Sequence, residues 1–173
     1  MGELSLVTLA VIAVNVLISF KGFSDQTFFN KYKFNVADIK NGSKFQIFTS
    51  GFLHVDPGHL FVNMLTLYFF ANVVIYGIGA PAFLIIYLGS LLLGNLLSYY
   101  FHKNDLNYTA VGASGAVMGI LYSAILLQPD MTLGLFFIIV GVILYSKTKY
   151  IFFIFLNIIL FIINEILYRF CLI

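Results

Sequence analysis

A serine framed by small residues opens an apolar stretch of the chain. Residues 109–119 read TAVGASGAVMG, which places Ser114 among Gly112, Gly115 and Gly119. A serine hydroxyl acts as a nucleophile when a base takes its proton and hydrogen-bond donors hold the oxyanion that forms. Packing is the other interpretation, because Gly115 and Gly119 have the G-x-x-x-G spacing that brings membrane helices to backbone distance. The motif alone leaves both open.

An earlier segment supplies candidate donors. It reads HVDPGHLFVNM, with His54 and His59 at the entry of an apolar run and Asn63 inside it. Residues four apart share one face of a helix, so His59 and Asn63 can donate toward the same point. Alternatively, His59 lies at the membrane surface and Asn63 bonds another helix. We predict no metal site and no cofactor, because no cysteine or carboxylate completes a tetrahedral set with the histidines.

The composition identifies the environment in which these residues work. Of the 173 residues, 61% are hydrophobic and 9% are charged, and the mean hydropathy is +1.02. Soluble domains are about half apolar and about one quarter charged. The sequence therefore predicts an all-α polytopic membrane protein. A net charge of +2 does not indicate a nucleic-acid partner, and a single cysteine, Cys171, excludes an internal disulfide framework.

Six apolar stretches approach the roughly 20 residues that a membrane-spanning helix needs. The predicted spans are residues 4–20, 59–78, 82–101, 111–127, 131–146 and 151–168. The first apolar run lacks a basic region and an A-x-A cleavage site, which favours a retained span over a signal peptide. Residues 21–58 are too polar to span, and their mixture of aromatics and lysines predicts a partly structured loop in the membrane interface. We expect one domain over residues 1–173.

From about Val36 to Phe137 the sequence resembles the rhomboid intramembrane serine proteases. The resemblance is carried by the ordered set of two histidines, an asparagine four residues after the second, and a G-x-S-G motif that opens a later span. It implies a six-helix bundle with a long interfacial first loop and a water-filled cavity. Ser114 is then the nucleophile, His59 and Asn63 form the oxyanion hole, and His54 has a supporting role. The implied partners are the lipid bilayer and transmembrane protein substrates, and the implied location is the inner membrane of a bacterium.

The chain departs from this family in the residue that would take the proton from Ser114. Rhomboid proteases carry a histidine in the sixth span, whereas the corresponding segment here reads IFFIFLNIILFIINEILY. His102, at the end of the third predicted span (82–101), is a weak substitute for the missing base. The alternative is therefore a catalytically inactive rhomboid-like protein that binds membrane helices, with a truncated or frameshifted C-terminal part. Gln46 stands about where the family's first loop often has an arginine.

Two arguments on membrane orientation disagree. Eight of the nine basic residues fall in the first, third and fifth predicted loops, and Arg169 falls on the other side. The positive-inside rule places those loops in the cytoplasm and the N-terminus outside. The family resemblance implies an N-terminus in the cytoplasm. We favour the orientation that the resemblance implies, because the positive-inside rule is statistical and the lysines lie mostly in one structured loop.

Overall fold

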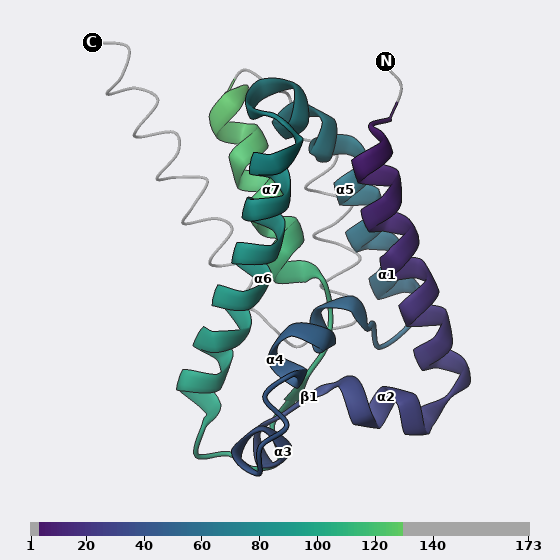
Figure 1. Cartoon of the computed structure of the whole chain (residues 1–173), viewed down its shortest axis with the longest axis vertical. Coiled ribbons are helices and arrows are strands. Elements are labelled where there is room, and N and C mark those ends of the chain that lie inside the picture. The colour runs from purple at the N-terminus through teal and green to yellow at the C-terminus, as the bar shows by residue number, and fades with distance from the viewer. Residues whose placement is uncertain (1–3, 130–173) are drawn as a thin grey trace. The chain divides into compact units, whose positions relative to one another are not determined.

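The computed structural model describes residues 4–129, and the residues up to Gln128 belong to one compact unit. This unit is built of helices, with one short two-stranded sheet (Figure 1). In chain order the elements are α1 (Leu6–Ser24), α2 (Gln26–Tyr32), β1 (Phe34–Asn35), α3 (Val36–Lys40), α4 (Gln46–Thr49), the 3-10 helix η1 (Ser50–Phe52), α5 (Pro57–Ile78), α6 (Ala80–His102), β2 (Thr109–Ala110) and α7 (Ser114–Leu127).

Three helices, α1, α5 and α6, are long and apolar enough to cross a membrane, and α7 is a shorter apolar helix. The prediction of a helical, multi-pass integral membrane protein is thereby confirmed. The first four predicted spans each correspond to one of these helices. The predicted fifth and sixth spans lie outside the described residues, so the count of six and the single domain over residues 1–173 stay predictions.

Helix α1 buries its polar side and exposes its apolar side. Its buried residues are Thr8, Asn15, Ser19 and Gly22, whereas Leu6 and Leu17 are among those that face outward. This arrangement suits a lipid solvent, in which polar side chains find partners only on neighbouring helices. The Asn15 side-chain amide, for example, donates to the Tyr87 hydroxyl on α6 at 2.9 Å.

Local sequence signals set the ends of α5 and α6. The Asp56 carboxylate caps α5 by accepting from the backbone N–H of His59 at 2.9 Å, and Pro57 occupies the first turn. Gly79 separates α5 from α6 with φ of +92°, a conformation that favours glycine. Helix α5 therefore begins two residues before the predicted 59–78 span, and α6 runs slightly beyond both ends of 82–101.

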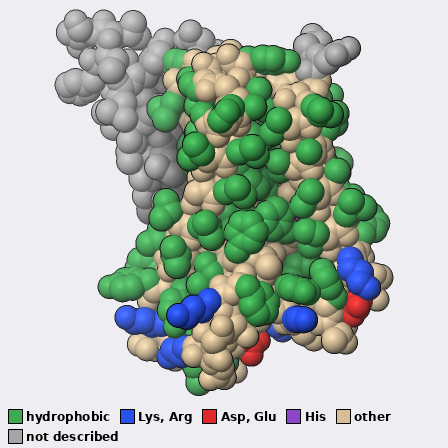
Figure 2. All heavy atoms as spheres, in the orientation of Figure 1, with side chains coloured by type: hydrophobic (Ala, Val, Ile, Leu, Met, Phe, Trp, Pro, Cys, Tyr) green, Lys and Arg blue, Asp and Glu red, His purple; other side chains and the backbone are tan. Residues whose placement is uncertain are grey.

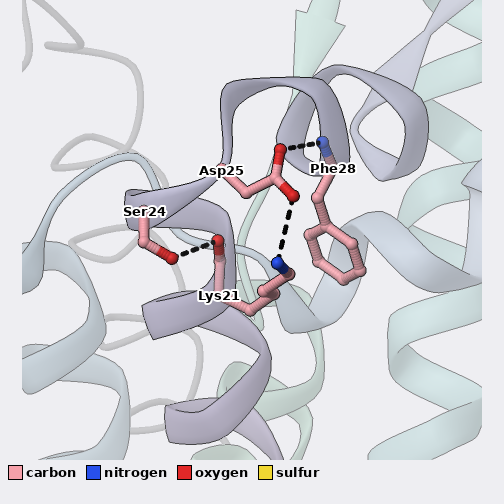
Figure 3. A network of polar contacts seen from close by, with 4 residues as sticks. All are labelled: Lys21, Ser24, Asp25 and Phe28. Atoms are coloured by element: carbon pink, nitrogen blue, oxygen red, sulfur yellow. Dashed lines mark hydrogen bonds and ion pairs between the residues drawn. The ribbon is translucent and has the colours of Figure 1, made fainter.

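The first loop is folded throughout. Helix α1 extends past the predicted residue 20 and turns into α2 at Asp25, which pairs with Lys21 at 3.1 Å and accepts from Phe28 N–H at 2.9 Å (Figure 3). Further along, the buried Gln46 amide donates to the Lys31 carbonyl oxygen and to Asp38, both at 3.2 Å, and accepts from the Asn35 N–H at 3.1 Å. A neutral glutamine thus organises the position where the family often has an arginine.

Two strands of two residues each modify the predicted all-α fold. Strands β1 and β2 pair antiparallel, with Phe34 opposite Ala110 and Asn35 opposite Thr109. The pairing joins the first loop to the segment that leads into α7. It could not be anticipated from period-2 patterning, because two residues are too few to show a period.

Small residues bring α6 and α7 close together. A Cβ atom built on Gly119 would overlap the Ser90 hydroxyl, and one built on Gly115 would lie 3.5 Å from the Ser90 carbonyl oxygen. Gly94 lies next to Gly115. The G-x-x-x-G spacing predicted a close helix partner, and among residues 4–129 that partner is α6.

Candidate functional site

Ser114 is the first residue of α7. The N-cap position is held by Ala113, and no side chain caps this helix. The intrahelical hydrogen bonds begin with Val117 N–H donating to the Ala113 carbonyl oxygen at 2.9 Å. The N–H groups of the first turn have no acceptor within the helix, and they carry the positive end of the helix dipole. Helix α7 therefore begins later than the predicted span 111–127, because residues 111–113 form the turn that precedes the serine.

The residue that shapes this turn is Gly112, which has φ of +131°. A Cβ atom built there would lie 2.7 Å from Cε1 and 3.1 Å from Nε2 of His59. The imidazole of His59 thus packs directly against the Gly112 backbone, two residues before Ser114. Glycine is required at this position both for its backbone conformation and for the space that the imidazole occupies.

Asn63 lies one helical turn after His59, on the predicted common face. Its side chain is 5% exposed, and its amide donates to the His59 carbonyl oxygen at 3.0 Å. An asparagine amide has two N–H hydrogens, so one donor remains beyond this contact. Because α5 packs along α7, the structure places His59 and Asn63 on the helix that faces the serine helix.

His54 is fully buried beside the same turn. Its Nε2 atom accepts from the Ala113 N–H at 3.4 Å, and its Nδ1 atom lies 2.8 Å from the Ser19 hydroxyl. An accepting Nε2 assigns the hydrogen to Nδ1, which then donates to Ser19, and Ser19 donates to the Phe52 carbonyl oxygen at 3.0 Å. His54 therefore connects α1 to the serine turn.

Burial keeps this imidazole neutral. Removal from water, with a smaller effect from the nearby His59, lowers the pKa of His54 from 6.5 to about 3, and Asp56 opposes that shift. The rings of His54 and His59 pack edge to face with centroids 5.1 Å apart. Two adjacent imidazoles in this environment disfavour a positive charge on His54.

The first loop also fixes the serine turn. The Ser50 carbonyl oxygen in η1 accepts from the Gly112 N–H at 3.0 Å. Asn95 on α6 donates to the Ser50 hydroxyl at 3.2 Å and to the Ile47 carbonyl oxygen at 2.7 Å. Sequence reasoning did not single out Ser19 or Ser50. Their only signal was a small polar residue within or beside an apolar stretch, which many membrane helices share.

His102 lies elsewhere. Its ring stacks on Tyr108 with centroids 3.7 Å apart. Helix α6 meets Gly115 at Gly94, eight residues before His102, which corresponds to about 12 Å along the helix axis. His102 is therefore not placed to take a proton from Ser114.

The chain is similar to proteins of one known family. A family model described as the rhomboid domain matches residues 41–168. The match continues beyond Phe137, where the motif resemblance was expected to end. RHOMBOID-like protein 12, mitochondrial, of Arabidopsis thaliana is 30% identical over 146 residues, which are 76% of this chain and 44% of that protein.

Two further relatives come from a bacterium and a fungus. The putative rhomboid protease YdcA of Bacillus subtilis is 34% identical over 82 residues, 47% of this chain and 40% of that protein. Rhomboid protein 1, mitochondrial, of Saccharomyces cerevisiae is 33% identical over 112 residues, 63% of this chain and 32% of that protein. The chain spans less than half the length of each of these relatives. With the family model matching most of its length, this chain belongs to the rhomboid family.

Proposed function

We propose that the chain is a rhomboid-type intramembrane serine endopeptidase, which hydrolyses peptide bonds in or near the transmembrane helices of membrane-protein substrates. One observation carries the proposal: Ser114 begins an uncapped helix directly after a turn on which the His59 imidazole packs. A helix start without a capping side chain breaks a common local rule, and such departures are typical of functional sites.

The proposed chemistry is acyl transfer. The Ser114 hydroxyl loses its proton to a base while its oxygen attacks the scissile carbonyl carbon. The resulting oxyanion accepts hydrogen bonds from the side chains of His59 and Asn63 and from the N–H at the start of α7. Collapse of this intermediate breaks the C–N bond, the amine leaves with a proton, and water then hydrolyses the serine ester.

The proton acceptor is not assigned. The sequence has three histidines. Of these, His54 is held between Ser19 and Ala113, His102 stacks on Tyr108, and we assign His59 to the oxyanion hole. The predicted sixth span, where the family would supply a histidine, lies outside the described residues and contains none.

This feature favours a second candidate, a rhomboid-like protein that binds transmembrane helices without cleaving them. The side chains of His59 and Asn63 would serve such a protein as hydrogen-bond donors to an unwound stretch of a bound helix. The two candidates differ in whether Ser114 reacts, and not in which partners the protein meets. For either candidate we propose no metal and no cofactor.

A fluorophosphonate probe separates the two. The full chain in detergent micelles is incubated with the probe and, separately, with a model transmembrane substrate, alongside Ser114→Ala. Ser123→Ala on the same helix is the matched control, since the Ser123 hydroxyl only donates to the Gly119 carbonyl oxygen within α7. The endopeptidase proposal expects labelling and cleavage that Ser114→Ala abolishes and Ser123→Ala retains. Unlabelled protein that still binds the substrate helix overturns it in favour of the second candidate.

The membrane in which the protein works also stays a proposal. The chain is an integral multi-pass protein, and the relatives include both mitochondrial proteins and one from a bacterium. We propose the bacterial inner membrane, with the N-terminus in the cytoplasm. A topology reporter fused to the C-terminus tests the orientation, because an outside signal contradicts a six-span chain that begins inside.

A further inference from the structure

Charged side chains gather at one end of the described unit. Six lysines and four aspartates occur between residues 4 and 129, all of them between residues 21 and 56 or at 103 and 105. Figure 2 shows lysines clustered at this end, below a broad hydrophobic surface. The lysines outnumber the aspartates, so this end of the unit carries net positive charge.

The aspartates at this end are already engaged within the protein. Each accepts at least one hydrogen bond: Asp25 from Phe28 N–H, Asp38 from the Gln46 amide, Asp56 from His59 N–H and Asp105 from Asn107 N–H. Lys40 and Lys44, in contrast, are exposed. Within residues 4–129 their ammonium groups make neither an ion pair nor a hydrogen bond. Their charge is therefore available to a partner.

Exposed aromatic side chains follow these lysines in the chain. On or next to α4, Phe45 is 46% exposed and Phe48 is 40% exposed. The Phe45 ring contacts Tyr32 with centroids 5.9 Å apart, and the Phe48 ring contacts Phe52 at 5.3 Å. These phenylalanines lie outside the membrane-spanning helices. Apolar rings next to lysines are typical of segments at the boundary between lipid headgroups and acyl chains.

We propose that this surface, formed by Lys40, Lys44, Phe45 and Phe48 and called here the loop surface, docks anionic phospholipids of the leaflet that it faces. The ammonium groups donate to phosphate oxygens, and the rings enter the acyl boundary beneath them. The charge of the loop surface complements an anionic headgroup and not a zwitterionic one. Each lysine near a charged membrane surface contributes about a fivefold increase in lipid affinity.

Hydrogen bonds link the loop surface to the turn that precedes Ser114, so a docked lipid can affect that turn. Phe45 and Phe48 belong to the same segment as Ile47 and Ser50. Ile47 and Ser50 accept hydrogen bonds from Asn95, and the Ser50 carbonyl oxygen accepts from Gly112 N–H. Lipid that holds the loop surface in place therefore also steadies the turn that precedes Ser114. This step concerns the position of the turn and does not depend on the proposed hydrolysis.

Selective quenching in bilayers tests the proposal. The chain contains no tryptophan, so Phe48→Trp gives a single reporter that keeps an aromatic ring on the loop surface. The full-length variant is reconstituted into phosphatidylcholine bilayers that contain either brominated phosphatidylglycerol or brominated phosphatidylcholine at equal mole fractions. We expect several-fold stronger quenching by the brominated anionic lipid. Lys40→Gln with Lys44→Gln in the same chain should abolish that preference.

Lys21→Gln is the matched control, because its ammonium group is paired with Asp25 in Figure 3. It should keep the preference for the anionic lipid. Hydrogen exchange of residues 109–114 should be slower in anionic bilayers, and the double variant should lose that protection. Equal quenching by both lipids overturns the proposal, as does a preference that survives in the double variant. Unchanged melting temperatures of the variants confirm that they fold.

Discussion

The Nδ1 atom of His54 lies 2.8 Å from the Ser19 hydroxyl oxygen, and this contact ties the first membrane helix to the serine turn. Through its other nitrogen the same imidazole accepts from Ala113 N–H. Both side chains are fully buried, so neither can exchange this partner for water. A contact between α1 and the loop before α5 thus helps to determine where α7 begins.

Ser19→Ala should destabilise the protein by about 1–3 kcal/mol, because it leaves the buried Nδ1–H of His54 without its acceptor. The measurement is thermal unfolding in detergent micelles. Ser24→Ala is the matched control, since the Ser24 hydroxyl is exposed and donates only to the Lys21 carbonyl oxygen in its own helix. Equal melting temperatures for the two variants would contradict a structural role for the contact.

The low pKa of His54 predicts a loss of stability in mild acid. The folded state holds this imidazole neutral down to about pH 3, whereas in the unfolded chain it protonates near its ordinary pKa of 6.5. A depressed folded-state pKa means that the unfolded state binds the proton more readily, so stability falls as pH drops below about 6.5. Well above pH 6.5 neither the folded nor the unfolded state holds a proton on this imidazole, so His54 causes no further change in stability at higher pH.

The check is the melting temperature at pH 7.5 and at pH 5 for the natural chain and for His54→Gln. Glutamine retains an acceptor for Ala113 N–H and a donor for Ser19, and it does not titrate. Its melting temperature should depend less on pH than that of the natural chain. His59 and Asp56, the other titratable groups near this ring, are unchanged in the variant and cancel in the comparison.

Gly112→Ala should be among the most harmful single changes in the described part of the chain. The positive φ strains any side chain, by about 1–3 kcal/mol, and the added methyl would also meet the His59 ring. Gly42→Ala separates the two effects, because Gly42 has φ of +109° and no heavy atom within 4 Å of its built Cβ. We expect a much larger drop in melting temperature for Gly112→Ala. Adding His59→Ala to it should recover part of the difference.

The membrane-spanning helices and their ends could largely be predicted from hydropathy and from the positions of glycine and proline. Gly79 marks the end of α5, and the polar residues of α1 lie on its buried face. The folded first loop was predicted only in outline. Its hydrogen bonds to Gln46 join residues 8 to 15 positions apart, and no local pattern records such pairings.

The sequence identified candidate residues for the site, but it did not indicate which of them contact one another. Because His59 and Asn63 are one turn apart on one helix, their common face follows from spacing. The approach of His59 to the Gly112 turn depends on how α5 packs on α7, and that packing is set by side-chain shape along both helices. Ser19 and Ser50 carry no signature of their own, so only the three-dimensional contacts reveal them.

Gly119 lies on the interface between α6 and α7. Gly119→Ala should lower the melting temperature, because its methyl group would overlap the Ser90 side chain. Gly89→Ala on α6 is the matched control, with no heavy atom within 4 Å of the built Cβ. That variant should be neutral or slightly stabilising, since alanine favours a helix over glycine by about 1 kcal/mol.

A second change on the facing helix decides whether the overlap is the cause. Ser90→Gly removes the side chain that the new methyl meets, so the Gly119→Ala, Ser90→Gly pair should be more stable than the two single effects predict when added. Simple additivity in thermal unfolding would mean that α6 and α7 do not touch at this point. In that case the contacts of the serine turn with His54, Ser50 and His59 would have the larger part in fixing the start of α7.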